Sequence, residues 1–426
     1  MGGASVYRER IARARDAARA AGVGALVIAP GADLRYLVGG AVGSHERFTG
    51  LLLPVDGDPV LVVPQLEAPG YDRFDLPGLG VRTATWVDGE DPHALAARHL
   101  GALEAVALGD LLPAVHVLGL RAALPGTEQR LAGPVLRELR MRKDAHEVEH
   151  LRAAGAAIDR VHARMGEWLR VGRTEAEVAA DIRAAIVEEG HAEARFAIVG
   201  SGPNGASPHH DVSDRVIAAG DVVVVDTGGA LPSGYCSDST RTYSLGAPAD
   251  DDVPATYEVL RAAQAAAVAT VRPGATAESI DAAARDVLVT AGLGRVSKAA
   301  VRDSRAGAAP GGTGRRHRYN PGTGTSTPHR QEPPRSRLSS NGLPKHGLGD
   351  LFIHRTGHGI GVEGHEHPYI VAGNDLRVAE GMAFSIEPGV YLPGRWGARI
   401  EDIVVVTDSG AESVNLRPHE LVELPA

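Results

Sequence analysis

Two successive units, each a pair of helices followed by strands, constrain the fold of residues 144–426 more than any other feature of the sequence. Asp144 is a typical N-cap for an alanine-rich helix to about Leu169. Thr174 with Glu177 forms a capping box that opens a second helix, to about Glu189. Strands follow, then helices near 255–271 and 278–290, then strands again. This repetition predicts a pseudo-duplicated α+β domain over 144–426.

Residues 1–140 follow a different pattern, in which helix signals alternate with short apolar runs at 25–29, 50–55 and 60–63. This alternation predicts a smaller α/β domain, joined to the larger one by a linker at 140–143. A chain of 426 residues agrees with two domains. The N-terminal region concentrates no ionisable residues, so we expect the chemistry to lie in the larger domain.

Residues 295–349 differ in composition from both domains. They hold eleven basic residues against Asp303 and Glu332, are rich in Pro, Gly, Ser and Arg, and show no apolar periodicity. Because such a composition cannot repay the entropy of folding, we predict a disordered insertion or a stretch outside the working protein. An arginine-rich RNA-binding tail is the alternative. Gly-Leu-Gly flanks the segment at 292–294 and 347–349, and deleting one copy with the residues between joins a helix C-cap to a strand.

Composition excludes several classes of protein. Hydrophobic residues make up 43% and charged residues 23%, which argues against a fibrous or wholly disordered chain. The apolar runs are far shorter than the roughly 20 residues that span a bilayer, and residues 7–13 offer no apolar core of a signal peptide, so we expect the cytoplasm and no membrane segment. A net charge of -9 gives no general attraction to nucleic acid. The single cysteine, Cys236, cannot form an intramolecular disulfide and is expected to be a small packing residue.

Asp226 ends the apolar run 222–225 and precedes a glycine turn, after which the chain returns through Asp238. A turn between adjacent strands would place the two carboxylates side by side, where they repel unless they share a proton or bind cations. Taken alone, each aspartate is more often a turn former.

A glycine-rich stretch holds His354, His358 and His365. The spacing of the first two resembles a helical zinc motif, but the glycines between and after them disfavour a helix, so we place these histidines on a strand or loop. Glu387 and Glu401 are predicted to lie inside apolar strands, where an unpaired carboxylate is costly to bury. Together with the two aspartates and one imidazole they make an oxygen-rich set able to hold two divalent cations, which favours Mn²⁺.

With these motifs in order, residues 195–294 and 350–426 resemble the M24 metallopeptidase family, which has the pita-bread fold and includes prolidases, aminopeptidases P and methionine aminopeptidases. The N-terminal region resembles the creatinase-like N-terminal domain of the prolidase and aminopeptidase P branch. The resemblance implies a dinuclear site in which two of the ligands, Asp238 and Glu401, bridge the ions. The implied metal ligands are Asp226, Asp238, His358, Glu387 and Glu401.

The resemblance also assigns roles around the metals. His209 and His365 match the family's substrate-side histidines, whereas His354 and Arg399 match positions that line the site and orient a ligand. Glu387 is placed to take and return a proton, and the two substrate-side histidines can donate to a developing oxyanion or to the leaving nitrogen.

The implied activity is hydrolysis of Xaa-Pro bonds in small proline-containing peptides by a homodimer with two Mn²⁺ ions, with Co²⁺ and Zn²⁺ as alternatives. A prolidase, which cleaves dipeptides, is the first expectation, and an aminopeptidase P acting on longer peptides is the second. Some prolidases carry an arginine four residues after the second histidine to bind the proline carboxylate, whereas this chain has Tyr369 there.

Three other functions stay open. Asp226-Thr-Gly and Asp408-Ser-Gly both fit the signature of aspartic proteases, although that fold is nearly all β. A creatinase-like hydrolase shares the fold but needs no metal, so five retained ligands argue against it. A peptide-binding module would result if the insertion before His354 displaced a ligand.

Overall fold

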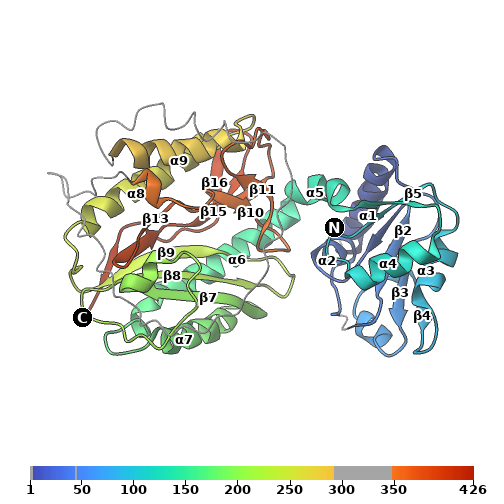
Figure 1. The fold of residues 1–426 in the computed structure, drawn as a ribbon, viewed down its shortest axis with the longest axis horizontal. Coiled ribbons are helices and arrows are strands. Elements are labelled where there is room, and N and C mark those ends of the chain that lie inside the picture. Colours follow the sequence, from blue (N-terminus) through green and yellow to red (C-terminus); the bar gives the residue numbers. More distant parts are fainter. Residues whose placement is uncertain (1–2, 44–45, 292–347) are drawn as a thin grey trace, which may run out of the picture.

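The computed structural model describes residues 3–43, 46–291 and 348–426. Figure 1 shows a smaller N-terminal domain beside a larger one, with the chain crossing between them at α5 (Gly133–Met141) and α6 (Ala145–Ala163). The predicted insertion 295–349 falls almost wholly outside the described residues. Its last two residues are described: Leu348 is buried in the core, and Gly349 begins a 3-10 turn that ends at Leu351.

The N-terminal domain is built on a mixed sheet in the order β4-β3-β2-β1-β5-β6. β1 runs antiparallel to β2 and parallel to β5. α1, α2 and α5 cover one face of this sheet and α3 and α4 the other, which confirms the α/β architecture. Its elements are α1 (Gly3–Ala20), β1 (Ala25–Ile28), α2 (Ala32–Val38), β2 (Gly50–Pro54), β3 (Val60–Pro64), β4 (Arg82–Trp86), α3 (Pro92–Leu100), β5 (Ala105–Leu108), α4 (Ala114–Ala123), β6 (Glu128–Leu131) and α5.

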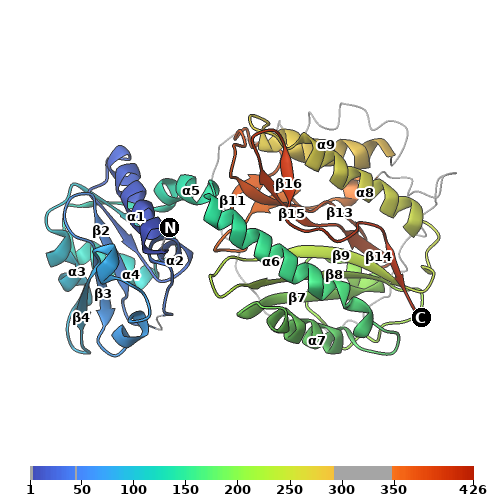
Figure 2. The ribbon, with the colours of Figure 1, turned by 180° about the vertical axis from the view of Figure 1, so that it is seen from behind.

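The larger domain repeats one arrangement twice, a helix pair packed on a sheet, which confirms the α+β class. α6 and α7 cover the sheet β17-β9-β8-β7, and α8 and α9 cover the sheet β11-β10-β12-β15-β16. Figure 2 shows α8 and α9 on one side of the strands and α7 on the other. The first unit holds α6, α7 (Glu175–Glu188), β7 (Glu193–Ser201), β8 (Val222–Ala230) and β9 (Ser239–Leu245). The second holds α8 (Val253–Thr270), α9 (Ala277–Ala291), β10 (Gly357–Gly359), β11 (Glu366–Ile370), β12 (Ala383–Ile386), β13 (Gly389–Leu392), β14 (Trp396–Arg399), β15 (Asp402–Val406) and β16 (Ala411–Ser413), and β17 (Val422–Leu424) returns to the first sheet.

Both predicted helix starts are present. The side chain of Asp144 accepts from the Glu147 N–H at 2.9 Å, and the Glu147 carboxylate accepts from the Asp144 N–H at 3.1 Å, so α6 begins with a capping box. Thr174 and Glu177 form the predicted capping box of α7, at 2.9 and 3.2 Å. Every side chain of β8 is buried, because the strand is covered on both faces.

The predicted linker at 140–143 is fixed by charged contacts between the domains. Arg140 donates to Asp33 of the N-terminal domain at 2.7 Å and also to Glu366 of β11. Lys143 is buried and donates to the same Glu366. Cys236 is buried in the hydrophobic cluster that continues from one domain into the other, which agrees with a packing role.

One expectation about the glutamates is wrong. Glu387 follows the last residue of β12, and Glu401 lies in the break between β14 and β15, so neither is inside a regular strand. Pro388 has no N–H to continue the ladder after Glu387, and the Glu401 N–H donates to Thr240 of the other sheet at 3.1 Å. The regular strand pairing of the second sheet therefore ends at both glutamates, and at Glu401 the backbone pairs with the first sheet instead.

In the described part of the chain, every helix is too short or too polar to cross a membrane.

Candidate functional site

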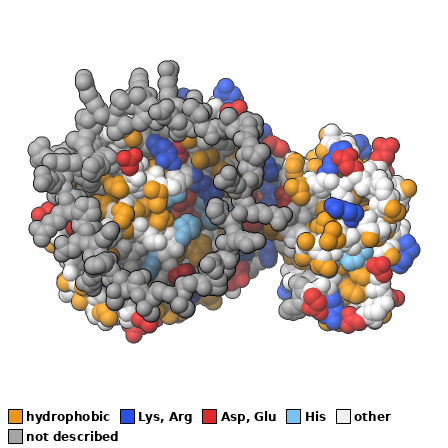
Figure 3. All heavy atoms as spheres, in the orientation of Figure 1, with side chains coloured by type: hydrophobic (Ala, Val, Ile, Leu, Met, Phe, Trp, Pro, Cys, Tyr) orange, Lys and Arg blue, Asp and Glu red, His pale blue; other side chains and the backbone are white. Residues whose placement is uncertain are grey.

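A pocket of about 540 Å³ lies between the two sheets of the larger domain. β8 and the turn before β9 supply one side, and β10, the ends of β12 and β14 and the loop before β11 supply the other. Figure 3 shows histidine side chains gathered near the middle of this domain's face. All nine residues predicted from the sequence for the site line this one pocket: His209, Asp226, Asp238, His354, His358, His365, Glu387, Arg399 and Glu401.

The five predicted ligands fall into overlapping groups. In each group, one ligand atom of every member lies within 4.8 Å of the others. Asp226, Asp238 and Glu401 form one group, and His358, Glu387 and Glu401 form a second, so Glu401 is common to both. Asp238 also groups with His358 and His365. A residue shared by two groups of donors is placed as a bridging ligand would be.

The register of the sheets explains this convergence. Asp226 on β8 lies opposite Thr240 on β9, and the Thr240 hydroxyl donates to the Glu401 carboxylate at 2.7 Å. Asp238 immediately precedes β9. The two carboxylates of the first sheet and the glutamate from the second unit therefore meet at one edge.

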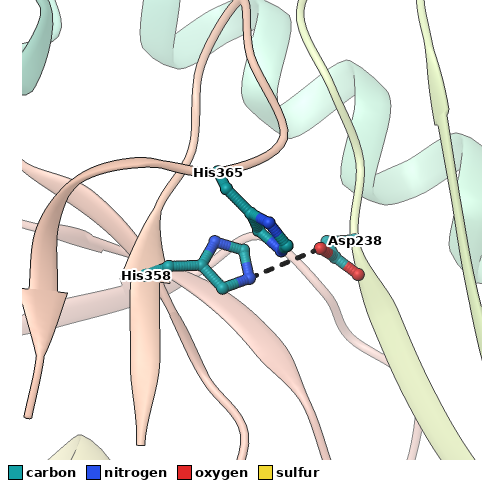
Figure 4. A group of neighbouring side chains, drawn as sticks. All are labelled: Asp238, His358 and His365. Atoms are coloured by element: carbon teal, nitrogen blue, oxygen red, sulfur yellow. Dashed lines mark ion pairs between the residues drawn. The ribbon is translucent and has the colours of Figure 1, made fainter. Parts of the chain in front are cut away.

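His358 is oriented as a neutral ligand. Its Nδ1–H donates to the Gly359 carbonyl at 3.1 Å, which leaves the Nε2 lone pair facing Asp238 at 3.6 Å and Glu387 at 3.4 Å. Burial, followed by the neighbouring His365 ring, lowers the pKa of His358 to about 3. Figure 4 shows its ring beside that of His365 and pointing toward Asp238, and the two ring centroids are 4.0 Å apart.

Arg399 forms hydrogen bonds with several residues of the site. Its guanidinium donates to Asp226 Oδ2 at 2.5 Å, to the Thr240 hydroxyl at 3.0 Å and to the Tyr391 hydroxyl at 2.8 Å. The Tyr391 hydroxyl in turn lies 2.8 Å from His354 Nε2, and His354 Nδ1 lies 2.7 Å from the Arg355 carbonyl. Because both ring nitrogens of His354 are engaged, this histidine and Arg399 form a hydrogen-bonded wall of the pocket.

Two further observations indicate that the five predicted ligands are suited to binding a cation. Asp226 Oδ1 is buried and has no hydrogen-bond partner, a costly arrangement that an ion would relieve. Burial, followed by the charges of Glu401 and Asp226, raises the pKa of Asp238 well above its usual value, and burial raises that of Glu387 to about 7. Burial and the charge of Glu387 likewise raise the pKa of Glu401. Carboxylates this close and this buried need positive charge to ionise together.

We therefore expect Mn²⁺ binding to release protons. A raised carboxyl pKa means that the metal-free site holds protons at pH 6, and a cation must displace them, so affinity should rise with pH up to and beyond about 7. Calorimetric titration at pH 6 in two buffers of different ionisation enthalpy measures the number of protons released. Equal apparent enthalpies in both buffers would contradict the expected release.

Sequence reasoning missed several residues that position the site. Ser385 donates to Glu387 at 3.0 Å and accepts from the His358 N–H at 3.0 Å, while Thr240 and Tyr391 hold Glu401 and Arg399 as described above. These are ordinary strand residues, and only the pairing of the strands gives them a role. The apolar residues Phe196, Ile198 and Pro208 complete the wall of the pocket.

Asp408, the second aspartate of the aspartic-protease alternative, lies elsewhere. It is exposed after β15 and does not line the pocket that holds Asp226. The two aspartates therefore cannot share a proton, as that mechanism requires.

Comparison with known proteins identifies the family of each domain. Residues 149–408 match the model of metallopeptidase family M24, and residues 10–142 match that of the creatinase/prolidase N-terminal domain. A probable dipeptidase PepE of Mycobacterium tuberculosis is 50% identical over 423 residues, which cover 99% of this chain and 98% of that protein. A Xaa-Pro dipeptidase of Lactobacillus helveticus is 31% identical over 404 residues, covering 92% of each chain.

Among solved structures, dipeptidase PepE from Mycobacterium ulcerans is 49% identical and superposes with a TM-score of 0.82 over all of both chains. The family model alone matches more than half of the sequence. The pita-bread fold expected from the motifs is thereby confirmed, and with it membership of a peptidase family. The chain belongs to metallopeptidase family M24, with a creatinase/prolidase N-terminal domain in front of its peptidase domain.

Proposed function

We propose that the protein is a Xaa-Pro dipeptidase that uses two divalent cations bound by Asp226, Asp238, His358, Glu387 and Glu401. The observation that carries the proposal is the pair of overlapping donor groups that share Glu401 inside one pocket. The Xaa-Pro dipeptidase activity named for the Lactobacillus relative supports the choice of substrate.

Several residues around the two ions would each have a separate role in hydrolysis. Bound there, two divalent cations would supply an activated water nucleophile near neutral pH and polarise the peptide carbonyl. Glu387 lies at the pocket wall with its side chain 14% exposed, so its carboxylate can accept the proton of the attacking water and return it. His209 and His365 are the exposed imidazoles of the pocket, and both can donate to the oxyanion or to the leaving nitrogen.

The apolar wall suits a proline ring. The nitrogen of a Xaa-Pro bond carries no hydrogen, so a site for it must bind the ring and the carbonyl. Phe196, Ile198 and Pro208 provide an apolar surface beside the carboxylates. Arg399 donates to the Pro208 carbonyl at 3.3 Å, which ties this wall to the metal site.

Hydrolysis assays on chelator-stripped protein, with and without added Mn²⁺, test the proposal. We expect metal-restored cleavage of Ala-Pro, with little turnover of Ala-Ala and of Ala-Pro-Ala. Cleavage of the tripeptide alone would instead indicate an aminopeptidase P, and equal cleavage of Ala-Ala would contradict Xaa-Pro specificity. Absence of turnover with metal bound would indicate a peptide-binding module.

The metal, the assembly and the location belong to the same proposal. Oxygen donors outnumber the single imidazole, which supports Mn²⁺ over Zn²⁺ or Co²⁺. We also propose a homodimer in the cytoplasm, which light scattering and cell fractionation would test.

A further inference from the structure

Two histidines lie four positions apart near the start of α6, in the stretch 146–150, which reads His-Glu-Val-Glu-His. Side chains at this spacing share one face of an α-helix, and two histidines so placed can bind one metal ion. The ring centroids of His146 and His150 are 4.5 Å apart. His146 is exposed and His150 half-buried, and neither lines the pocket of the predicted metal ligands. The pair is thus a group of nitrogen donors separate from those ligands.

Both imidazoles have nitrogens available for an ion. Among the described residues, neither ring forms a hydrogen bond or an ion pair with another residue, and their contacts are between rings. Burial, followed by the charge of His146, lowers the pKa of His150, so this ring is mainly neutral at pH 7 and keeps a lone pair for a metal. The ring of His150 also stacks on that of Tyr235, with centroids 5.1 Å apart and planes inclined by 12°. This stacking restricts the side chain and reduces the rotamer entropy lost on binding.

The charges around the pair are suited to a cation. The carboxylates of Glu149 and Asp144 both oppose the lowering of the His150 pKa, so both lie close enough to act on that ring. Arg10 acts on it in the opposite direction, but its guanidinium is paired with Asp144 at 3.0 Å and with Glu147 at 3.4 Å. Glu149 is exposed, so its side chain can supply an oxygen ligand while water completes the coordination of the ion.

The glutamate between the histidines does not make this a second peptidase centre. In helical zinc peptidases with the pattern His-Glu-x-x-His, the glutamate is the general base beside the metal. Glu147 is instead buried, and its carboxylate accepts from the Tyr235 hydroxyl at 2.9 Å and from the Asp144 N–H at 3.1 Å. The pair is therefore suited to binding an ion and not to activating water with this glutamate.

We propose that His146 and His150 bind one divalent transition-metal ion, Zn²⁺ in the first instance, at the surface of α6. Imidazole nitrogen suits Zn²⁺, Cu²⁺ and Ni²⁺, whereas the proposed catalytic site is rich in oxygen donors, so the two sites differ in the metal that they prefer. An ion held by both rings spans one turn of α6, close to where the chain enters the larger domain (Figure 2). Binding therefore stabilises the start of this helix.

Modification of histidines by diethyl pyrocarbonate, followed residue by residue with mass spectrometry, tests the site in the Mn²⁺-loaded protein. The reagent attacks the nitrogens that the ion would occupy. Free Zn²⁺ at about 100 µM should slow modification of His146 and His150 about tenfold, the protection expected at about ten times the Kd. His99, which is exposed on α3, is the internal control and should react equally fast with and without Zn²⁺. Unchanged rates at His146 and His150 would overturn the proposal.

Single replacements test whether the two rings act together. In His146→Gln and in His150→Gln, the remaining histidine should lose its protection, because the loss of one ligand weakens binding by at least about tenfold. His99→Gln is the matched control and should leave the protection of both rings unchanged. Circular dichroism should show all three variants folded. Full protection of His150 in His146→Gln would mean that one imidazole binds alone and would overturn the shared site. These readouts need no turnover, so they are independent of the proposed function.

Discussion

Replacing Asp238 with asparagine should lower kcat for Ala-Pro hydrolysis by about 10³-fold, because bound cations supply several kcal/mol of transition-state stabilisation. Asp238 is buried and belongs to two of the donor groups, so its loss weakens both halves of the site. Metal analysis of the purified variant should show less than the two Mn²⁺ per chain expected for the wild type.

Asp408→Asn is the matched control for this variant. Asp408 is exposed and lies outside the pocket, so its replacement should change neither turnover nor metal content. An aspartic protease would lose activity with either aspartate, so full activity of Asp408→Asn would agree with the separation of Asp408 from the pocket. Turnover by Asp238→Asn within tenfold of wild type would contradict the assignment of Asp238 as a ligand.

The same variant should have the opposite effect on stability when metal is absent. Burial, Glu401 and Asp226 raise the pKa of Asp238, so ionising it in the folded state costs stability at any pH above its unfolded value of about 3.9. Removing that carboxyl relieves the repulsion, and metal-free Asp238→Asn should melt at a higher temperature than metal-free wild type at pH 7.5. The stabilisation gained on adding Mn²⁺ should be correspondingly smaller.

Local signals predicted the helices and the order of the ligands. The caps at Asp144 and Thr174 fix helix starts through contacts within three residues, so one sequence suffices to find them. Asp226 and Glu401 were identifiable because a carboxylate beside an apolar run needs a partner. The position of Glu401 between strands was not, because it depends on Thr240 in a different sheet.

The hydrogen-bond partners of Arg399 could not be predicted for the same reason. The motif places Arg399 in the site, but its bond to Asp226 joins residues 173 positions apart. Residue types indicate which chemistry a site can perform, and the pairing of distant strands decides which side chains stay free to perform it.

Replacing Glu175 with glutamine should destabilise the metal-loaded protein by about 3 kcal/mol, although Glu175 lies outside the pocket. Glu175 is the first residue of α7 and is fully buried. Its carboxylate accepts from Ser201 at 2.6 Å, from Ser213 at 2.7 Å and from His210 at 2.8 Å. Ser201 ends β7, and His210 and Ser213 lie on the segment between β7 and β8 that carries His209, so the carboxylate fixes the backbone next to a proposed catalytic residue. A glutamine amide in its place would direct an N–H group at side chains that donate to the wild-type carboxylate, so some of these hydrogen bonds would be lost.

The fall in melting temperature should be roughly 6–12 °C, measured by circular dichroism at pH 7, and kcat should fall as well because His209 loses its support. Burial alone would raise the pKa of Glu175, but hydrogen bonds from Ser201, Ser213 and His210 outweigh it and lower the pKa. A lowered carboxyl pKa contributes stability above its unfolded value of about 4.3 and loses it as the pH falls through the folded value. The difference between Glu175→Gln and wild type should therefore shrink below pH 4.

Glu177→Gln provides the control on the same helix turn. Glu177 is 57% exposed, and besides completing the capping box it forms only a long ion pair with Arg173 at 3.9 Å, so its replacement should cost about 1 kcal/mol or less and leave kcat unchanged. Equal destabilisation by the two variants would mean that Glu175 acts only at the helix end. A large loss confined to Glu175→Gln, together with reduced turnover, would mean that α7 positions the loop of His209 through this one buried carboxylate.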